Sequence, residues 1–299
     1  MYAVRMTLSE KIYQVIAHIL VILAAVAAVV PFMFVVSASL TPQVVLDRYG
    51  GYLLIPPVVT FEAYRIVLGT GQMQQAFMVS VARVLLGTLL HLAVSGAAGY
   101  ALSKTNLIGR KFWITIFIIS FLFGPGLIPY YVLCRQLGLV NTFWMYVIPG
   151  AAGPWSIFIF RQFFMGLPKE LEEAAILDGA NEFQVLGRVV LPLSKPVFAA
   201  LGLFTGVGHW NDYLTSVIYV RNPDLFPVAM VLQNVLSFAQ GYELSRSSTL
   251  MKDADLLRQI PGHSLKMATV VVATVPILLV YPFLQKYFAK GMLTGAIKG

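Results

Sequence analysis

The sequence predicts an all-α membrane protein, and three observations support that fold class. Of the 299 residues, 58% are hydrophobic and 11% are charged, whereas a soluble domain carries about 25% charged residues. Apolar runs recur along the chain, each long enough to cross a bilayer as a helix of about 20 residues. The runs also lack the alternation of apolar and polar residues, in segments of about 10, that is typical of a membrane β-barrel.

Six apolar stretches are predicted to span the membrane. Their approximate limits are residues 14–40, 75–102, 112–134, 141–164, 196–220 and 264–288. The first span and the outer loop after it form an N-terminal part, residues 1–74, and the other five spans form a core, residues 75–299. Small residues cluster in "SGAAGYALS" of the second span, which lets a neighbouring helix approach closely.

Basic residues in the short links predict the orientation, because cytoplasmic loops carry an excess of Lys and Arg. The link at 103–111 holds three basic residues and the link at 135–140 holds one. We therefore expect both termini and the stretch 165–195 to lie in the cytoplasm. The same rule accounts for the net charge of +8 without a nucleic-acid partner.

The stretch "LPKELEEAAILDGANEFQVLGRVVLP" predicts two short helices outside the membrane, joined by a corner. Pro168 suits a first helical turn, and the acids that follow it lie at that helix's positive end. Gly179 fits the residue just past a helix end, where φ is often positive. Asn181 is a predicted cap of the second helix, which Pro192 ends. The apolar face of this second helix is predicted to consist of Phe183, Leu186, Val189 and Val190.

Two alanines in this stretch, Ala174 and Ala175, leave almost no side chain between the backbone and whatever contacts it. Two interpretations stay open from the residues alone. One is an element that docks a partner protein, and the other is an interfacial hairpin that packs on its own chain.

The same stretch resembles the EAA motif of the permease subunits of binding-protein-dependent ABC importers. The family pattern is E-A-A-x-x-D-G-A, followed by L-P and a further proline, here Pro196. The matching residues are Glu173, Ala174, Ala175, Asp178, Gly179, Ala180, Leu191 and Pro192. The chain departs from the pattern mildly, with Leu186 where phenylalanine is usual and Val189 where isoleucine is usual.

Further segments resemble the carbohydrate branch of that family, the maltose-type inner-membrane subunits. They are "GYALSKTNLIGRKF", "LIPYYVLCRQLGLVNT", "RQFFMGLPKELEEAA", "HWNDYL" and "KGMLTGAIKG". The resemblance covers residues 75–299, and the first span is compatible with it.

The resemblance implies the type I ABC importer permease fold, with residues 168–196 as a cytoplasmic coupling loop between the fourth and fifth helices. In that family the coupling helix docks on an ATPase subunit, and the C-terminal tail, here residues 289–299 with Gly295 and Lys298, also reaches the ATPase pair. The implied partners are a homologous second permease subunit, two ATP-binding-cassette ATPase subunits and an extracytoplasmic solute-binding protein. ATP and Mg²⁺ belong to the ATPase, so neither cofactor nor metal is expected here. The implied location is the bacterial cytoplasmic (inner) membrane.

Polar residues within the spans are candidates for a translocation path or gate, because a carboxylate at the bilayer centre costs on the order of 2.5–3.5 kcal/mol. The candidates in the fifth span are His209, Trp210, Asn211 and Asp212. Asn211 and Asp212 suit a structural clasp or a gate, and His209 and Trp210 are expected nearer the path. Arg83 is expected to snorkel outward, with a cationic lining for an anionic substrate as the alternative. His91 is expected to be a packed polar residue.

The function predicted from these features is that of a permease subunit for an oligo- or polysaccharide, with an alginate-like polyuronate as the first candidate. The chain lacks a P-loop, so energy must come through a partner. The alternatives are an ion-gradient-driven secondary transporter, which Asp212 alone supports, and an intramembrane enzyme, for which no catalytic constellation is present. In the long loop 221–263, "FPVAMVLQNVLSFA" predicts an outer-surface helix, and the polar run after it is a hypothetical contact for the binding protein.

Overall fold

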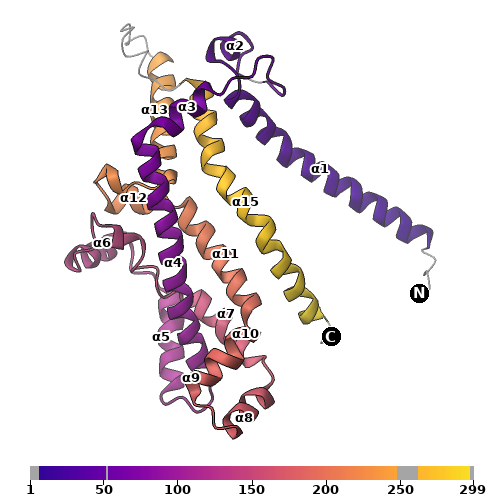
Figure 1. Cartoon of the computed structure of the whole chain (residues 1–299), viewed down its shortest axis with the longest axis vertical. Helices are drawn as coiled ribbons and strands as arrows, with labels where there is room; N and C mark the ends of the chain where they lie inside the picture. The colour runs from indigo at the N-terminus through magenta and orange to yellow at the C-terminus, as the bar shows by residue number, and fades with distance from the viewer. Residues whose placement is uncertain (1–6, 52, 248–261, 297–299) are drawn as a thin grey trace. The chain divides into compact units, whose positions relative to one another are not determined.

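The computed structural model describes residues 7–51, 53–247 and 262–296, and the regular elements within these ranges are all helical (Figure 1). The chain divides into two units, Met1–Thr70 with Asn234–Thr274 and Gly71–Gln233 with Val275–Gly299. Two helices, α13 (Val228–Ser247) and α15 (His263–Ala296), contribute residues to both units.

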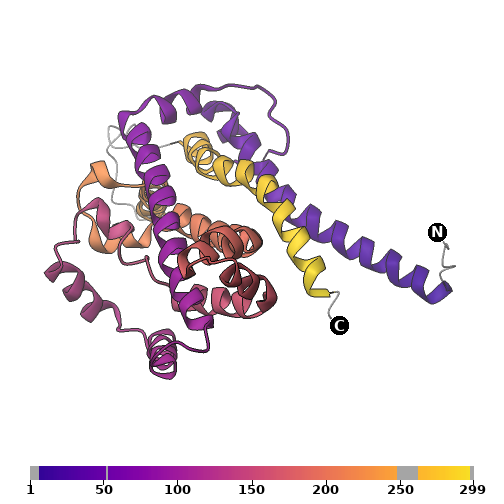
Figure 2. The same ribbon diagram turned by 60° about the horizontal axis from the view of Figure 1, so that its bottom comes forward.

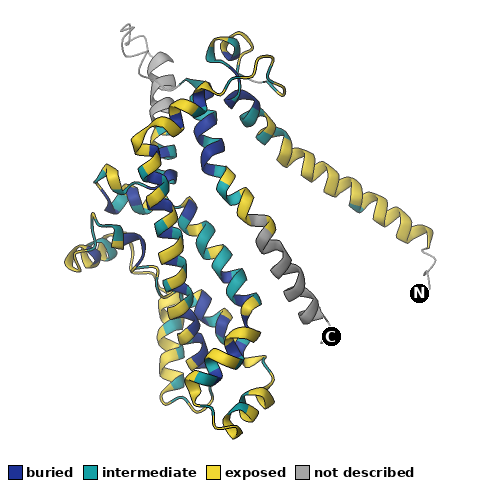
Figure 3. Ribbon diagram, in the orientation of Figure 1, coloured by how far each residue is buried: buried dark blue, intermediate teal, exposed yellow. Residues whose placement is uncertain are grey.

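The first unit begins with α1 (Leu8–Ser39), which is capped by Thr7 and confirms the first predicted span. Its apolar side chains are mostly exposed, as the colouring in Figure 3 shows. The end of α1 is tied to α3 (Glu62–Gly69) by a 2.6 Å hydrogen bond between the Ser39 and Tyr64 hydroxyls. In α2 (Gln43–Arg48), the Gln43 Oε1 accepts from the Ser264 backbone N–H at 3.0 Å.

The core of the second unit is formed by α4 (Gly71–Ser103), α7 (Pro154–Met165) and α11 (Lys195–Asn211), with α7 and α11 lying alongside α4 (Figures 1 and 2). A Cβ at Gly99 would lie 2.5 Å from the Phe160 Cβ, so the small residue allows α7 to approach α4. The Phe160 ring is fully buried and lies 4.5 Å from the Phe198 ring of α11. The prediction of close packing at "SGAAGYALS" is confirmed.

The third predicted span, 112–134, is not one straight helix. It consists of α5 (Arg110–Leu122) and α6 (Leu127–Gln136), which meet at 117°. The break follows from "GPG" at residues 124–126, because Pro125 lacks a backbone donor and Gly126 has a φ of 76°.

The fourth predicted span, 141–164, is also interrupted. It contains the short 3₁₀ helix η1 (Phe143–Tyr146) and the 12-residue α7, separated by the turn "PGAAG". Within the described residues, three helices are long and apolar enough to cross a membrane, or up to five if each bent pair counts as one span. The predicted count of six is therefore not confirmed by helix length, whereas the spans at 14–40, 75–102 and 264–288 each coincide with a long helix.

The fifth predicted span, 196–220, breaks near its end. Helix α11 stops at Asn211, and α12 (Leu214–Tyr219) follows after Asp212 and Tyr213. The chain then passes through η3 (Pro223–Leu225) into α13, whose Val228 N–H donates to Ser80 Oγ at 2.8 Å. The predicted helix in the long loop is thus present, while most of the polar run after it, residues 248–261, lies outside the described residues.

Candidate functional site

Residues 168–196, the predicted coupling loop, are called the coupling segment below. Its first half is α8 (Lys169–Leu177), which begins after Pro168 with Glu170 and Glu172 in its first turn. Its end is a Schellman motif around Gly179, whose φ is 83°. The Gly179 N–H donates to the Ile176 carbonyl and the Ala180 N–H to the Ala175 carbonyl, both at 2.9 Å. The predicted glycine corner is therefore confirmed.

The second half begins with α9 (Glu182–Val185), capped by Asn181 as predicted. The Asn181 Oδ1 accepts from the Gln184 N–H at 2.9 Å, and the Gln184 Oε1 accepts from the Asn181 N–H at 2.9 Å. The chain continues through the short π-helix η2 (Leu186–Val190) and α10 (Leu191–Leu193). The helical run from Glu182 ends at Leu193, one residue after Pro192, so the predicted helix end is confirmed to within one residue. The chain bends by 76° at this break, around Ser194.

The inner side of this segment packs on the bundle. Val185 and Val190 are buried in a cluster with Tyr100, Phe160 and Phe164, and smaller side chains pack against the same cluster. These partly buried neighbours include Ala175, Ala180 and Leu186. The prediction missed Val185, although it lies four positions before Val189 and so shares the helical spacing of the apolar face.

The outer side of the segment exposes large apolar groups. Leu177 is 88% exposed and Phe183 is 86% exposed, and Ile176 is also exposed. Phe183 was predicted on the apolar face of the second helix, and the structure leaves it exposed while Val185 and Val190 are buried. Of the predicted docking residues, six are exposed and Ala175 and Ala180 are partly buried. The exposed six are Glu173, Ala174, Asp178, Gly179, Leu191 and Pro192. Most of α8 is accordingly coloured as exposed in Figure 3.

An ion pair connects this segment to α4. The Lys104 Nζ, just past the end of α4, pairs with the Glu172 carboxylate of α8, and the same ammonium lies 4.5 Å from the centre of the Tyr100 ring. Burial lowers the pKa of Lys104, but its hydrogen bonds to Glu172 and Tyr100 raise it by more, so the pKa lies above its usual value. Lys104 is therefore charged at neutral pH.

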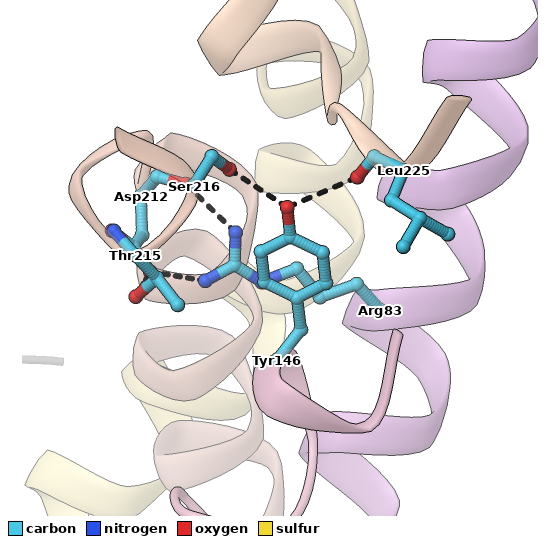
Figure 4. Close-up of polar contacts among 6 residues, drawn as sticks. All are labelled: Arg83, Tyr146, Asp212, Thr215, Ser216 and Leu225. Carbon is cyan, nitrogen blue, oxygen red and sulfur yellow. Dashed lines mark hydrogen bonds and ion pairs between the residues drawn. The ribbon is translucent and has the colours of Figure 1, made fainter. Parts of the chain in front are cut away.

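A second polar site lies in the bundle, where Arg83 of α4 meets the break between α11 and α12 (Figure 4). The Arg83 guanidinium pairs with the Asp212 carboxylate, and its Nη1 donates to the Asp212 carbonyl at 2.7 Å. The Asp212 carboxylate also accepts from the Thr215 N–H at 3.1 Å and the Thr215 hydroxyl at 2.6 Å. The Arg83 side chain is 3% exposed, so the prediction that it snorkels outward is wrong; its charge is satisfied internally.

Tyr146 of η1 completes this arrangement. Its ring lies against the guanidinium, 4.5 Å from the Arg83 Cζ, and its hydroxyl donates to the Leu225 carbonyl at 3.0 Å and lies 2.9 Å from the Ser216 Oγ. The sequence did not indicate that Tyr146 and Ser216 meet at this site, because neither has a local signal that identifies a partner 70 residues away.

The two polar residues Arg83 and Asp212 border a cavity of about 390 Å³, with aromatic rings and small polar side chains in its walls. The other lining residues are Tyr130, Met145, Tyr146, Pro149, Gly150, Thr205, Gly208, His209, Thr215 and Tyr219. His209 lines this cavity, and its ring occupies the space that a Cβ at Gly87 would need. Its place near a translocation path stays a prediction. The remaining candidates lie elsewhere, because Trp210 is buried with its ring 6.2 Å from that of Phe77 and Asn211 is exposed.

His91 is a packed polar residue, as predicted. Its Nδ1 lies 2.8 Å from the Gly150 carbonyl and its Nε2 lies 2.8 Å from the Ser156 Oγ. Of the two tail residues, Gly295 belongs to the last turn of α15, and Lys298 lies outside the described residues. Neither position tests a contact with another subunit.

Comparison with known proteins assigns the chain to a family. Residues 53–294 match the family described as binding-protein-dependent transport system inner membrane component. The chain belongs to this family. The prediction of the ABC importer permease class is thereby confirmed, and the ion-gradient alternative loses its support because Asp212 is held by Arg83.

Relatives of this inner membrane component extend over almost the whole chain. The polygalacturonan/rhamnogalacturonan transport system permease protein YtcP of Bacillus subtilis is 32% identical over 98% of this chain and 100% of its own length. Protein LplC of the same organism is 36% identical over 91% of this chain and 90% of its own. A chain in the crystal structure of a bacterial ABC transporter involved in the import of the acidic polysaccharide alginate matches with a TM-score of 0.83 at 25% identity. The match covers 96% of this chain and 100% of that one.

Proposed function

We propose that this chain is one of two transmembrane subunits of a heteromeric ABC importer that carries an oligo- or polysaccharide into the cytoplasm. The observation that carries the proposal is the coupling segment, which holds a rigid corner at Gly179 and exposes Ile176, Leu177 and Phe183 on a polar projection. Large exposed apolar groups on a segment outside the predicted membrane spans favour a protein interaction site. Membership of the transport family and the carbohydrate permeases among the relatives support it.

The proposed assembly contains a homologous second permease subunit, two ATP-binding-cassette ATPase subunits and an extracytoplasmic solute-binding protein. ATP and Mg²⁺ bind to the ATPase subunits, and this chain itself makes and breaks no covalent bond. Both termini and the coupling segment face the cytoplasm. Glu173 through Ala180, with Leu191 and Pro192, dock on one ATPase subunit, and the tail with Gly295 and Lys298 makes a second contact.

In the proposed mechanism, ATP binding closes the ATPase pair and carries α8 with it. The hydrogen-bonded Schellman corner and the packing of Val185 and Val190 make α8 and α9 move as one piece. The two permease subunits then rock between inward-facing and outward-facing states. His209, Arg83 and Asp212 border the translocation path, and the Arg83–Asp212 pair, with Trp210 and Asn211 on the same turn, forms a clasp or gate at the helix break.

A polyuronate is the first substrate to test, because relatives include a polygalacturonan permease and a structural neighbour from an alginate importer. Arg83 does not argue for an anionic substrate, because Asp212 cancels its charge. Selectivity for acidic sugars therefore belongs chiefly to the binding protein. Titrating that protein with alginate, galacturonan and arabinan oligosaccharides tests the substrate class directly.

The docking role is tested by Gly179→Val in the complex reconstituted with the ATPase subunits and the binding protein. A valine at positive φ distorts the corner, although nothing lies within 4 Å of the new Cβ. We expect insertion to be retained and uptake to be uncoupled from ATP hydrolysis. Gly187→Val is a matched control, because Gly187 is also exposed with nothing within 4 Å of a Cβ but has no positive φ. Normal uptake and normal copurification of the ATPase in Gly179→Val would overturn the proposal.

A further inference from the structure

Two ion pairs occur among the described residues, and the function proposed above uses one of them, Arg83–Asp212. The other joins Lys104, the residue after α4, to Glu172 in the first turn of α8. Both of its side chains are partly buried, Lys104 at 24% exposed and Glu172 at 20% exposed. A fully exposed surface ion pair contributes little to stability. The partial burial of Lys104 and Glu172 restricts their side chains and favours this one contact.

The pair is placed so that each charge matches the helix end beside it. Lys104 follows the C-terminus of α4, where the helix dipole is negative, and Glu172 lies at the N-terminus of α8, where it is positive. The ion pair therefore joins two helix ends of opposite sign. The Tyr100 ring under the ammonium adds a cation–π contact from α4 itself.

The α4 end of this contact is anchored in the bundle. The Leu102 carbonyl accepts from the Arg110 Nε at 3.1 Å and from the Arg161 Nε at 3.3 Å. Tyr100 packs edge-on against the Phe164 ring of α7 at 5.8 Å. From this anchored end, α4 runs without a break to Arg83, roughly 30 Å away at 1.5 Å per residue.

We propose that Lys104 and Glu172 are positioning residues that transmit the displacement of α8 to α4, and through α4 to the cavity bordered by Arg83. This inference rests on the proposed function, because it takes α8 as the element that the ATPase moves. Packing holds α8 mainly against α9 and η2, with Ala175 against the buried cluster around Tyr100. The ion pair adds a direct charged link from α8 to a helix that reaches the cavity.

The test uses the whole complex in lipid nanodiscs, with a cysteine reporter at the cavity. Thr205→Cys in a Cys134→Ser background places a single cysteine in the cavity lining. Its alkylation rate by a maleimide, with and without ATP and vanadate, measures the conformational response without any sugar. Copurification of the ATPase subunits is measured in parallel, because a merely structural role of the pair would lower docking as well.

We expect Lys104→Met and Glu172→Gln each to reduce the ATP-dependent change in alkylation rate about fivefold or more, which corresponds to the smallest coupling factor that is typical of linked sites. The ATPase should still copurify with both variants. The double variant should lose no more than either single one, because the pair acts as a unit. Lys104→Arg should keep the response. The charge exchange Lys104→Glu with Glu172→Lys should restore the ATP-dependent response only in part, because each charge then lies beside a helix end of the same sign.

Glu170→Gln is the matched control, since Glu170 lies in the same first turn but is exposed. An equal loss in Glu170→Gln, or a full response in both Lys104→Met and Glu172→Gln, would overturn the positioning role alone. A wild-type complex that shows no ATP-dependent change and retains no ATPase would overturn the proposed function together with it.

Discussion

The cavity and the coupling segment both hold side chains that are unusual for their surroundings. The unusual side chains are paired within the chain at the cavity and are exposed in the coupling segment. In the cavity, Arg83 and Asp212 are charged groups in an apolar bundle, and each finds its partners within the chain. In the coupling segment, Leu177 and Phe183 are apolar groups on a polar projection, and both remain exposed. The Arg83–Asp212 ion pair is made within one subunit, whereas the exposed apolar groups fit a surface that another protein covers.

The largest expected effect comes from breaking the buried ion pair. Asp212→Ala leaves the Arg83 charge buried without its carboxylate, and removing one member of a buried pair costs about 3–5 kcal/mol. We expect a marked loss of thermal stability of the purified subunit, measured by tryptophan fluorescence on heating. Asp212→Asn, which keeps an oxygen acceptor for Arg83 and Thr215, should lose less. Equal stability of wild type and Asp212→Ala would show that the bundle does not depend on this pair.

The same chemical change at two phenylalanines sharpens the comparison. Phe160 is fully buried, so Phe160→Ala should cost about 3–5 kcal/mol. Phe183 is exposed, so Phe183→Ala should change stability by only about 0.5 kcal/mol. We expect the reverse order for retention of the ATPase subunits in pull-down experiments, where Phe183→Ala should be the more harmful once the folded fraction is equalised. Full retention in Phe183→Ala would remove Phe183 from the docking face.

A smaller effect is expected from Tyr146→Phe, which keeps the ring against Arg83 but removes the hydroxyl. The Leu225 carbonyl and the Ser216 hydroxyl then lose a buried partner, which costs about 1–3 kcal/mol. The midpoint of thermal unfolding measures this loss. A variant as stable as wild type would mean that water replaces the hydroxyl.

The smallest effect is expected from Asn181→Ala, because it removes only the cap of α9. Loss of an N-cap costs about 1 kcal/mol, and the capping box around Gln184 is lost with it. Hydrogen exchange of the amides at residues 182–185 should accelerate, while the midpoint of global unfolding stays close to that of wild type. Unchanged exchange would show that packing of Val185 alone holds the helix.

Local rules explain which parts of the fold could be predicted. The long apolar runs correctly placed α1, α4 and α15, because a helix of that length needs nothing beyond its own hydrogen bonds. The corner at Gly179 and the cap at Asn181 were predictable for the same reason, since each depends on residues within four positions. The break at Gly126 had a local signal in "GPG" that the length of the apolar run obscured.

The candidate sites were predicted less completely, because their contacts join distant residues. Asp212 was singled out correctly, but its partner Arg83 lies 129 positions away, and the prediction directed Arg83 outward. Lys104 and Glu172 are 68 positions apart and were not paired. The Asp212–Thr215 contact spans only three residues, so it is the one contact of this site with a local signal, in "DYLT".

The sequence by itself determined that the chain is a helical membrane protein with a helix–glycine–helix projection, because composition and short-range hydrogen bonding depend on neighbours along the chain. Only the tertiary structure decided which polar residues meet and which apolar residues stay outside. The guanidinium of Arg83 finds an anionic partner in Asp212, and the ring of Phe183 is left exposed, because of what other helices place beside them. Such placement follows from packing between distant segments, and no local pattern encodes it.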